Sequence, residues 1–323
     1  MNLQTKNIKS KTTNFESETQ SRTNCIVCNS TSCELLFDEI KDLEYETYKP
    51  VKYSICAKCR LIFQDPVPAS ELISNFYPDE YRNYLPVKKI FFSFLKNTQF
   101  KNQAKKITNY CRKNISDTKI LEIGFGNGQL LLALKALGFK NLYGADFTDK
   151  MFSSLLENEI SLKAANLEKE FPFDEKFDLI IMNNVIEHFV NPFQVLEKCK
   201  EHLNENGKIV LITPNTNALE FSIFKKYWAG FHAPRHIYLF NPENIKLTGE
   251  KLGFKNIIIE PGLDPGQWSI SIQNIFQDNS FTRTKLQNGM AWYLLPLSLA
   301  VCPIAYFQNV IGKSTSIMCV LER

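Results

Sequence analysis

Two pairs of cysteines have the spacing of a metal site. Cys25 and Cys28 form one CxxC pair, Cys56 and Cys59 form a second, and residues 29–55 lie between them. Each CxxC turn brings two thiolates to one side of the chain, so two such turns complete a tetrahedral set of four sulfur ligands. Four thiolates with no open position are typical of a structural zinc ion, which holds together a segment too small to bury its own core. We therefore predict zinc here, and four buried free cysteines are the alternative.

A second group of residues is suited to a nucleotide-like ligand. The stretch LEIGFGNGQ, residues 121–129, carries Glu122 near the end of an apolar run and then glycines at Gly124, Gly126 and Gly128. A dinucleotide fingerprint, GxGxxG, needs a wider spacing before its last glycine, and the neighbouring carboxylate would repel its pyrophosphate. A cationic ligand would tolerate that carboxylate. The pattern therefore favours a positively charged, nucleotide-like ligand, with a dinucleotide or an empty glycine turn as alternatives.

These residues need a scaffold, and strands and helices alternate from Lys119 onward. Apolar runs predict strands at 119–123, 141–145, 160–164, 177–182, 208–213 and 255–260, and helical periodicity predicts helices at 129–137, 194–203 and 242–252. This alternation is typical of a parallel, doubly wound α/β sheet. Ligands of such sheets lie over the carboxyl ends of the strands. The glycine loop, Asp146, the turn at Asn166–Leu167 and the NNVIEH loop all fall at that edge.

In this context the ExGxGxG loop resembles the S-adenosylmethionine loop of class I methyltransferases, and the resemblance extends over about residues 119–260. It implies a Rossmann-like sheet of seven strands and S-adenosylmethionine as the cofactor. Asp146 matches the acid that holds the ribose hydroxyls, Asn166 and Leu167 fall where the family contacts adenine, and FDLIIMNNVIEHFVNP matches the loop beneath the methionine portion. The residues implied to bind the cofactor are Glu122, Gly124, Gly126, Gly128, Asp146, Phe147, Asn166, Leu167 and Asn184.

The whole layout resembles bacterial methyltransferases in which a small zinc module precedes the catalytic domain. The segments that carry this resemblance are CIVC, YSICAKCRLIFQDPVP, FYPDEY, LEIGFGNG, VIEHFVNP and WAGFHAPRHIYLF. Relatives of this kind methylate sugars or other small molecules in surface-polysaccharide or natural-product pathways. The sugar C-methyltransferases among them carry a further C-terminal domain for which this chain is too short, so we expect O-methylation. C- or N-methylation of a nucleotide-linked sugar or a lipid-linked, quinone-like acceptor is the alternative, and a zinc-containing scaffold protein with a degenerate cofactor site is the non-enzyme alternative.

Methyl transfer to a hydroxyl requires a group that aligns the acceptor and takes its proton, and histidine is the natural base near neutral pH. His188 follows Glu187 in the loop after the fourth strand, and His236 lies in PRHIYLF, which follows the fifth strand. We predict one of these two as the general base, with His232 as a weaker candidate; a structural histidine is the alternative for each. Ubiquinone-pathway O-methyltransferases resemble this loop but carry a metal-supporting Glu where this chain has Asn184, which speaks against a catalytic metal.

The composition divides the chain into four segments. We expect a polar, disordered tail at 1–23, a zinc-binding module at 24–68, a helical linker or lid at 69–118 and the methyltransferase domain at 119–323. The tail has no apolar core of signal-peptide length, which predicts a reducing cytoplasm without structural disulfides. Apart from the two pairs and Cys33, the chain has four cysteines. They lie in apolar or helical contexts that predict core positions: Cys111, Cys199, Cys302 and Cys319.

Residues 286–312 contain no charged side chain, a length that permits a membrane-spanning helix. However, residues 316–323 predict an antiparallel strand beside the sixth strand, and a span would separate that strand from its sheet. We therefore expect 262–313 to be an apolar helical insertion that serves as a substrate lid, a dimer surface or a peripheral contact with the inner face of the cytoplasmic membrane. A net charge of +4 without a long basic block argues against a nucleic-acid partner. A small-molecule acceptor is expected, and no oligomeric state is predicted.

Overall fold

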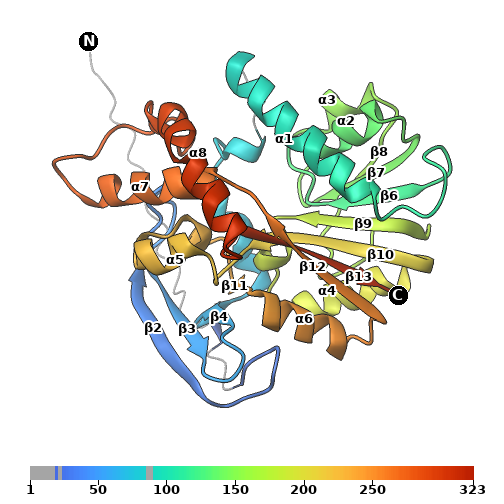
Figure 1. Ribbon diagram of the computed structural model, residues 1–323. Coiled ribbons are helices and arrows are strands. Elements are labelled where there is room, and N and C mark those ends of the chain that lie inside the picture. The colour runs from blue at the N-terminus through green and yellow to red at the C-terminus, as the bar shows by residue number, and fades with distance from the viewer. Residues whose placement is uncertain (1–18, 21–23, 85–89) are drawn as a thin grey trace, which may run out of the picture.

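The computed structural model describes residues 19–20, 24–84 and 90–323, and its centre is a seven-stranded mixed sheet (Figure 1). The strand order is β12-β13-β10-β9-β6-β7-β8. The strands are β6 (Lys119–Ile123), β7 (Asn141–Asp146), β8 (Ser161–Ala164), β9 (Phe177–Asn183), β10 (Leu203–Pro214), β12 (Asn256–Gly262) and β13 (Ser316–Glu322). Only β13 runs antiparallel to its neighbours, β10 and β12. The predicted doubly wound sheet and its antiparallel last strand are confirmed.

Helices cover both faces of this sheet (Figure 1). One face carries α1 (Ile90–Thr108), α2 (Gln129–Ala136) and α3 (Phe152–Leu156), and the other carries α4 (Pro192–Glu201) and α6 (Pro242–Lys251). Because its strands are buried on both faces, their sequences are continuous apolar runs, such as the LIIM of β9. Two apolar clusters, one on each face, form the core.

The N-terminal module is an antiparallel sheet that borrows one strand from the C-terminal half. Its strands β2 (Cys33–Ile40), β3 (Val51–Cys56) and β4 (Ile62–Gln64) are completed by β11 (Tyr238–Leu239), in the order β11-β4-β3-β2. A two-stranded ladder joins β1 (Thr19–Gln20) to β5 (Val67–Pro68); the rest of the predicted tail at 1–23 lies outside the described residues. The module and the C-terminal half of the chain therefore share hydrogen bonds and a core.

The remaining segments lie at the carboxyl edge of the main sheet. The linker contains the short 3₁₀ helices η2 (Ser70–Phe76) and η3 (Arg82–Tyr84), and η4 (Ile186–His188) follows β9. After β10 come α5 (Leu219–Phe224), η5 (Lys225–Tyr227) and η6 (Ala229–Phe231).

Between β12 and β13 lie α7 (Gly266–Asp278) and α8 (Leu294–Val310), so the predicted helical insertion is confirmed. No helix in the described part of the chain is long and apolar enough to cross a membrane. One cysteine prediction is wrong: Cys199 and Cys319 are buried, but Cys302 is exposed because it lies on the outward face of α8.

Candidate functional site

The glycine loop between β6 and α2 has a backbone that favours glycine at three positions. Gly124, Gly126 and Gly128 have φ angles of +67°, +53° and +71°, in the left-handed region where a Cβ is strained. A Cβ at Gly124 would also lie 2.4 Å from Val185, and one at Gly128 would lie 2.4 Å from Leu155. Glycine is therefore required for the left-handed backbone of this loop and, at Gly124 and Gly128, because neighbouring side chains leave no room for a Cβ.

Two buried carboxylates flank the loop. Asp146 accepts hydrogen bonds from the backbone N–H groups of Gly126 at 3.0 Å and Thr148 at 3.3 Å. Oε2 of Glu122 is buried with no hydrogen-bond partner among the described residues. Burial and the charge of Asp146 raise the pKa of Glu122 well above its usual value, and burial raises the pKa of Asp146 to about 6. Two buried acids so close together are unfavourable alone and fit a ligand that offers hydroxyl donors and positive charge.

The other residues predicted to bind the cofactor lie at the same edge. The N–H of Ala165 donates to the carbonyl of Asp146 at 2.8 Å, which brings the turn at Asn166 beside the acid. Phe147 is half exposed, Asn184 has a left-handed backbone with φ +54°, and the side chain of Leu167 is buried in the core. The structure thus brings the predicted set together, and direct contact of each residue with a ligand remains a prediction.

The aromatic segment FYPDEYRNY packs over this edge. Tyr77 and Tyr84 contact the ring of Phe147, with centroid distances of 5.2 and 5.7 Å. The carbonyl oxygen of Asn83 lies 3.3 Å from the point that a Cβ of Gly126 would occupy. The linker therefore packs against Phe147 and the glycine loop, and it would form one wall of the predicted cofactor site. The sequence showed the aromatic residues, but it gave no signal for where they pack.

Three of the four histidines form one buried cluster. The rings of His188 and His236 lie 4.6 Å apart, and those of His232 and His236 lie 5.1 Å apart. Nδ1 of His188 is 2.9 Å from both the carbonyl oxygen of Arg235 and the hydroxyl of Tyr77. Because a carbonyl can only accept, the Nδ1 of His188 carries the proton and its Nε2 carries the lone pair. The same argument applies to His236, whose Nδ1 donates to a backbone carbonyl at 2.7 Å.

Burial sets the charge of this cluster. It lowers the pKa of His188 to about 3 and that of His236 well below its usual value, so both rings are neutral at physiological pH. Burial also raises the pKa of Glu187 to about 8, although the hydroxyl of Thr213 donates to its Oε2 at 3.0 Å. Its Oε1 lies 3.8 Å from Nε2 of His236. Glu187, His188 and His236 together offer three ligand atoms within 4.8 Å of one another, an arrangement that can hold a proton or a small cation.

A buried ion pair attaches the module to the main domain. Arg235 is fully buried and donates to both carboxylate oxygens of Asp42, at 2.8 and 3.3 Å. It also donates to the carbonyls of Phe76 and Ala233, at 3.0 and 3.1 Å. Burial alone would raise the pKa of Asp42, but the Arg235 charge outweighs it and lowers that pKa. Sequence reasoning missed this pair, because two charges 193 residues apart form no local pattern.

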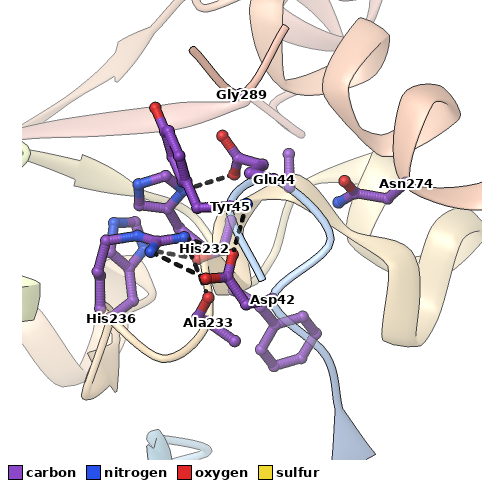
Figure 2. Close-up of polar contacts among 12 residues, drawn as sticks. Asp42, Glu44, Tyr45, His232, Ala233, His236, Asn274 and Gly289 are labelled. Carbon is purple, nitrogen blue, oxygen red and sulfur yellow. Dashed lines mark hydrogen bonds and ion pairs between the residues drawn. The ribbon is translucent and has the colours of Figure 1, made fainter. Parts of the chain in front are cut away.

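A second acid of the module, Glu44, pairs with His232. Nδ1 of His232 lies 2.6 Å from Oε1 of Glu44 (Figure 2). The guanidinium of Arg82 lies 3.4 Å from the other oxygen. Although burial opposes it, the charges of His232 and Arg82 lower the pKa of Glu44 to about 2. His232, the weaker base candidate, is therefore occupied by a structural partner.

A cavity of about 400 Å³ opens beside this pair. It is lined by Glu44, Tyr45, Pro78, Glu80 and Leu286–Gly289, which come from the module, the linker and the insertion. The hydroxyl of Tyr45 donates to the carbonyl of Asn288 at 3.3 Å, and Figure 2 shows Tyr45 beside Gly289. The volume is within the range of small-molecule sites.

The four paired cysteines converge at the end of the module. Sγ of Cys25 lies 3.6 Å from that of Cys59, Sγ of Cys28 lies 3.4 Å from that of Cys56, and all four lie within 4.8 Å of one another. These distances exceed a disulfide bond of about 2.0 Å. They approach the separation of about 3.8 Å that a tetrahedral site with Zn–S bonds of about 2.3 Å requires. The four residues present therefore fit a zinc ion.

The turn that carries Cys56 and Cys59 also contacts the main domain directly. Asn241 caps α6 and forms a reciprocal capping box with Asn244. The side-chain amides of both residues lie 3.4 Å from the carbonyl oxygen of Cys59 and donate to it. The N-terminus of α6 thus supports the turn that carries Cys56 and Cys59.

Comparisons with known proteins agree with this geometry. A family model described as a methyltransferase domain matches residues 94–258, about half of the chain. Ribosomal protein L11 methyltransferase of Lactobacillus johnsonii is 32% identical over 106 residues, 31% of this chain and 32% of that protein. Ubiquinone biosynthesis O-methyltransferase of Rickettsia akari is 28% identical over 144 residues, 43% of this chain and 55% of that protein. The chain thus spans about a third to a half of the length of these curated relatives.

A solved structure shares the fold. Phosphoethanolamine N-methyltransferase 2 of Haemonchus contortus, in complex with phosphomonomethylethanolamine and S-adenosylhomocysteine, matches with a TM-score of 0.50 and 16% identity. The match covers 80% of this chain and 62% of that one. At this identity the likeness concerns the fold alone.

Proposed function

Because this chain belongs to the methyltransferase-domain family, we propose that it is an S-adenosylmethionine-dependent O-methyltransferase that acts on a sugar or a similar small molecule. The observation that carries the proposal is the pair of buried carboxylates, Glu122 and Asp146, beside a loop of three glycines with positive φ angles. The O-methyltransferases among the curated relatives support a hydroxyl as the methyl acceptor. The pathway would be surface-polysaccharide or secondary-metabolite biosynthesis.

The residues at the edge of the main sheet fit the cofactor, which when bound supplies an activated methyl group on a sulfonium. Asp146 would accept hydrogen bonds from the ribose hydroxyls, and Glu122 would offset the positive charge of the ligand. The glycine loop would present backbone groups to the ligand, and its positive φ angles favour glycine at these positions. The turn at Asn166 would lie against the adenine.

We infer that His188 is the general base. It contacts Tyr77, and Tyr77 in turn contacts Phe147 directly after Asp146, so His188 is the histidine next to the cofactor edge. Its Nδ1–H is fixed on the carbonyl of Arg235, which leaves Nε2 free to take a proton. His236 lies behind it, against Glu187, and would orient His188.

The cavity beside Glu44 suits a polyhydroxyl acceptor. Carboxylates at Glu44 and Glu80 accept hydrogen bonds from hydroxyls, and the ring of Tyr45 offers a flat face. The backbone at residues 286–289 adds carbonyl and amide groups. We infer that the zinc predicted at the four paired cysteines holds the module in place and so positions the Glu44 and Tyr45 wall of this cavity.

Calorimetric titration with S-adenosylhomocysteine tests the cofactor part. We expect the unmodified protein to bind it and Asp146→Ala to bind at least tenfold more weakly, while the exposed neighbour variant Asp149→Ala binds normally. Transfer of labelled methyl groups to a panel of nucleotide-linked sugars and quinol-type phenols tests the acceptor. Absence of S-adenosylhomocysteine binding in the unmodified protein, or equal affinity in the two variants, would overturn the proposal.

A further inference from the structure

The helix α8 presents an apolar face to solvent. Its inward face buries Leu294, Val301 and Ala305, and the last two belong to a core cluster that includes Trp268 of α7 and residues of the module. The outward face carries exposed Leu299, Ile304, Tyr306, Phe307, Val310 and, just beyond the helix, Ile311. Val310 is 70% exposed and Phe307 is 61% exposed. A surface helix of a globular protein normally turns polar residues outward, so this face lacks its partner.

Two aromatic side chains in the connection between α7 and α8 protrude even further. Phe281 is 97% exposed and Trp292 is 80% exposed. Neither belongs to the cofactor edge or to the lining of the cavity. Protruding single aromatics insert readily into a deformable lipid layer, where tryptophan prefers the interfacial region.

The charge of the segment is also one-sided. From residue 279 to residue 315 the chain contains Arg283, Lys285 and Lys313 and no acidic residue. Arg283 already pairs with Glu46 of the module. Lys285 and Lys313 bracket the uncharged stretch, so they would lie at the level of the head groups when the apolar face meets a bilayer. This distribution complements an anionic lipid surface.

We propose that the face formed by Phe281, Trp292 and the outward side of α8 docks on an anionic membrane surface. Figure 1 shows α7 and α8 at the periphery, across the molecule from α2 and α3, so the docked protein would keep its main sheet in water. The segment Leu286–Gly289, which lines the cavity, lies between the two protruding aromatics in the chain. Docking therefore brings one wall of the cavity close to the lipid surface. If the cavity holds the methyl acceptor, this placement predicts an acceptor that is linked to a lipid. This prediction about the acceptor rests on the proposed function, whereas the docking itself does not.

The chain contains its own reporter for the test. Trp228 and Trp268 are 1% and 6% exposed, so a change in tryptophan emission on binding comes mainly from Trp292. The full chain is mixed with vesicles of equimolar phosphatidylglycerol and phosphatidylcholine, with neither cofactor nor acceptor present. We expect co-sedimentation with these vesicles, a blue shift of the emission, and quenching of Trp292 by lipids brominated on the acyl chain.

Variants locate the contact. Phe281→Ser together with Phe307→Ser should lower the vesicle partition coefficient at least tenfold, while Leu156→Ser, at an apolar residue on α3 that is 58% exposed, should leave it unchanged. Vesicles of phosphatidylcholine alone should bind at least tenfold more weakly than the anionic ones. Absence of binding to anionic vesicles would overturn the proposal, as would equal partitioning of the two variants. A dimer in size-exclusion light scattering that Phe281→Ser with Phe307→Ser dissociates, without vesicle binding, would assign the face to a second copy instead.

Discussion

Replacing Arg235 by methionine should destabilise the protein strongly, because it leaves Asp42 as a buried and unpaired carboxylate. The side chains of this pair are 0% and 1% exposed. Removal of one partner from a buried ion pair costs about 3–5 kcal/mol. Asp42 would keep the hydroxyl of Thr47 at 2.8 Å and the N–H groups of Thr47 and Tyr45 at 3.1 and 3.2 Å. These three donors place the expected loss at the low end, about 3 kcal/mol.

Urea unfolding followed by tryptophan fluorescence measures this loss, since Trp228 and Trp268 are buried. The matched control is Lys52→Met, which breaks the exposed 2.7 Å pair with Asp38, whose two side chains are 56% and 69% exposed. It should change the free energy of unfolding by less than about 1 kcal/mol. A double variant, Arg235→Met with Asp42→Asn, should recover about 2 kcal/mol, because no buried charge remains.

The pH dependence supplies a further check on the same variant. The folded-state pKa of Asp42 lies below its usual value in the unmodified protein, so its stabilisation is present above the unfolded pKa and is lost as pH falls through the folded pKa. Without Arg235, burial raises that pKa, so the difference between the two proteins should begin to shrink as pH falls through the raised pKa of the variant, above the usual value of about 4, and should vanish below the lowered pKa of the unmodified protein. A loss in Arg235→Met no larger than that of the surface control would refute the reasoning, because it would mean that the pair is not desolvated.

Three further predictions concern the proposed sites. His188→Ala should lower turnover at least a hundredfold and leave S-adenosylhomocysteine affinity within about twofold, and unchanged turnover in rate assays would exclude it as the base. Affinity for S-adenosylhomocysteine should fall as pH drops below about 6, because protonated Asp146 accepts fewer hydrogen bonds from the ribose hydroxyls. The dissociation constants measured by calorimetry at pH 5 and pH 7.5 should differ about tenfold, and binding that does not depend on pH would contradict the role of Asp146. Cys56→Ser should remove one equivalent of zinc in elemental analysis and lower the thermal midpoint, whereas Cys302→Ser, an exposed control, should do neither.

The sequence was sufficient for the features that rest on local pattern. The strands on either side of the glycine loop follow from apolar runs and turn residues, and the structure places Asp146 and the loop in contact, as the pattern implied. The insertion before β13 was also predictable, because the last strand had to return to the sheet. These features depend on neighbours in the chain or on a general rule of parallel sheets.

The buried pairs Asp42–Arg235 and Glu44–His232 were not predictable in the same way. Asp42 and Glu44 find Arg235 and His232 across most of the chain, and each residue alone reads as an ordinary surface charge. The prediction that Cys302 lies in the core was wrong for a related reason. An apolar run looks the same whether its outer face is covered or open, so the exposure of α8 followed only from the packing of α7 and α8. Long-range pairing and the covering of a face are properties of the assembled fold.

The strand that β11 contributes to the module affects the order of events during synthesis. Residues 24–68 leave the ribosome early, but β4 has no partner on one edge until Tyr238 and Leu239 have been made. Until then the nascent module exposes an unpaired strand, a site at which chains associate wrongly. Early binding of zinc would hold the two CxxC turns of the module in their folded form during this interval. We expect nascent chains that stop before residue 238 to need chaperones more than the complete chain does.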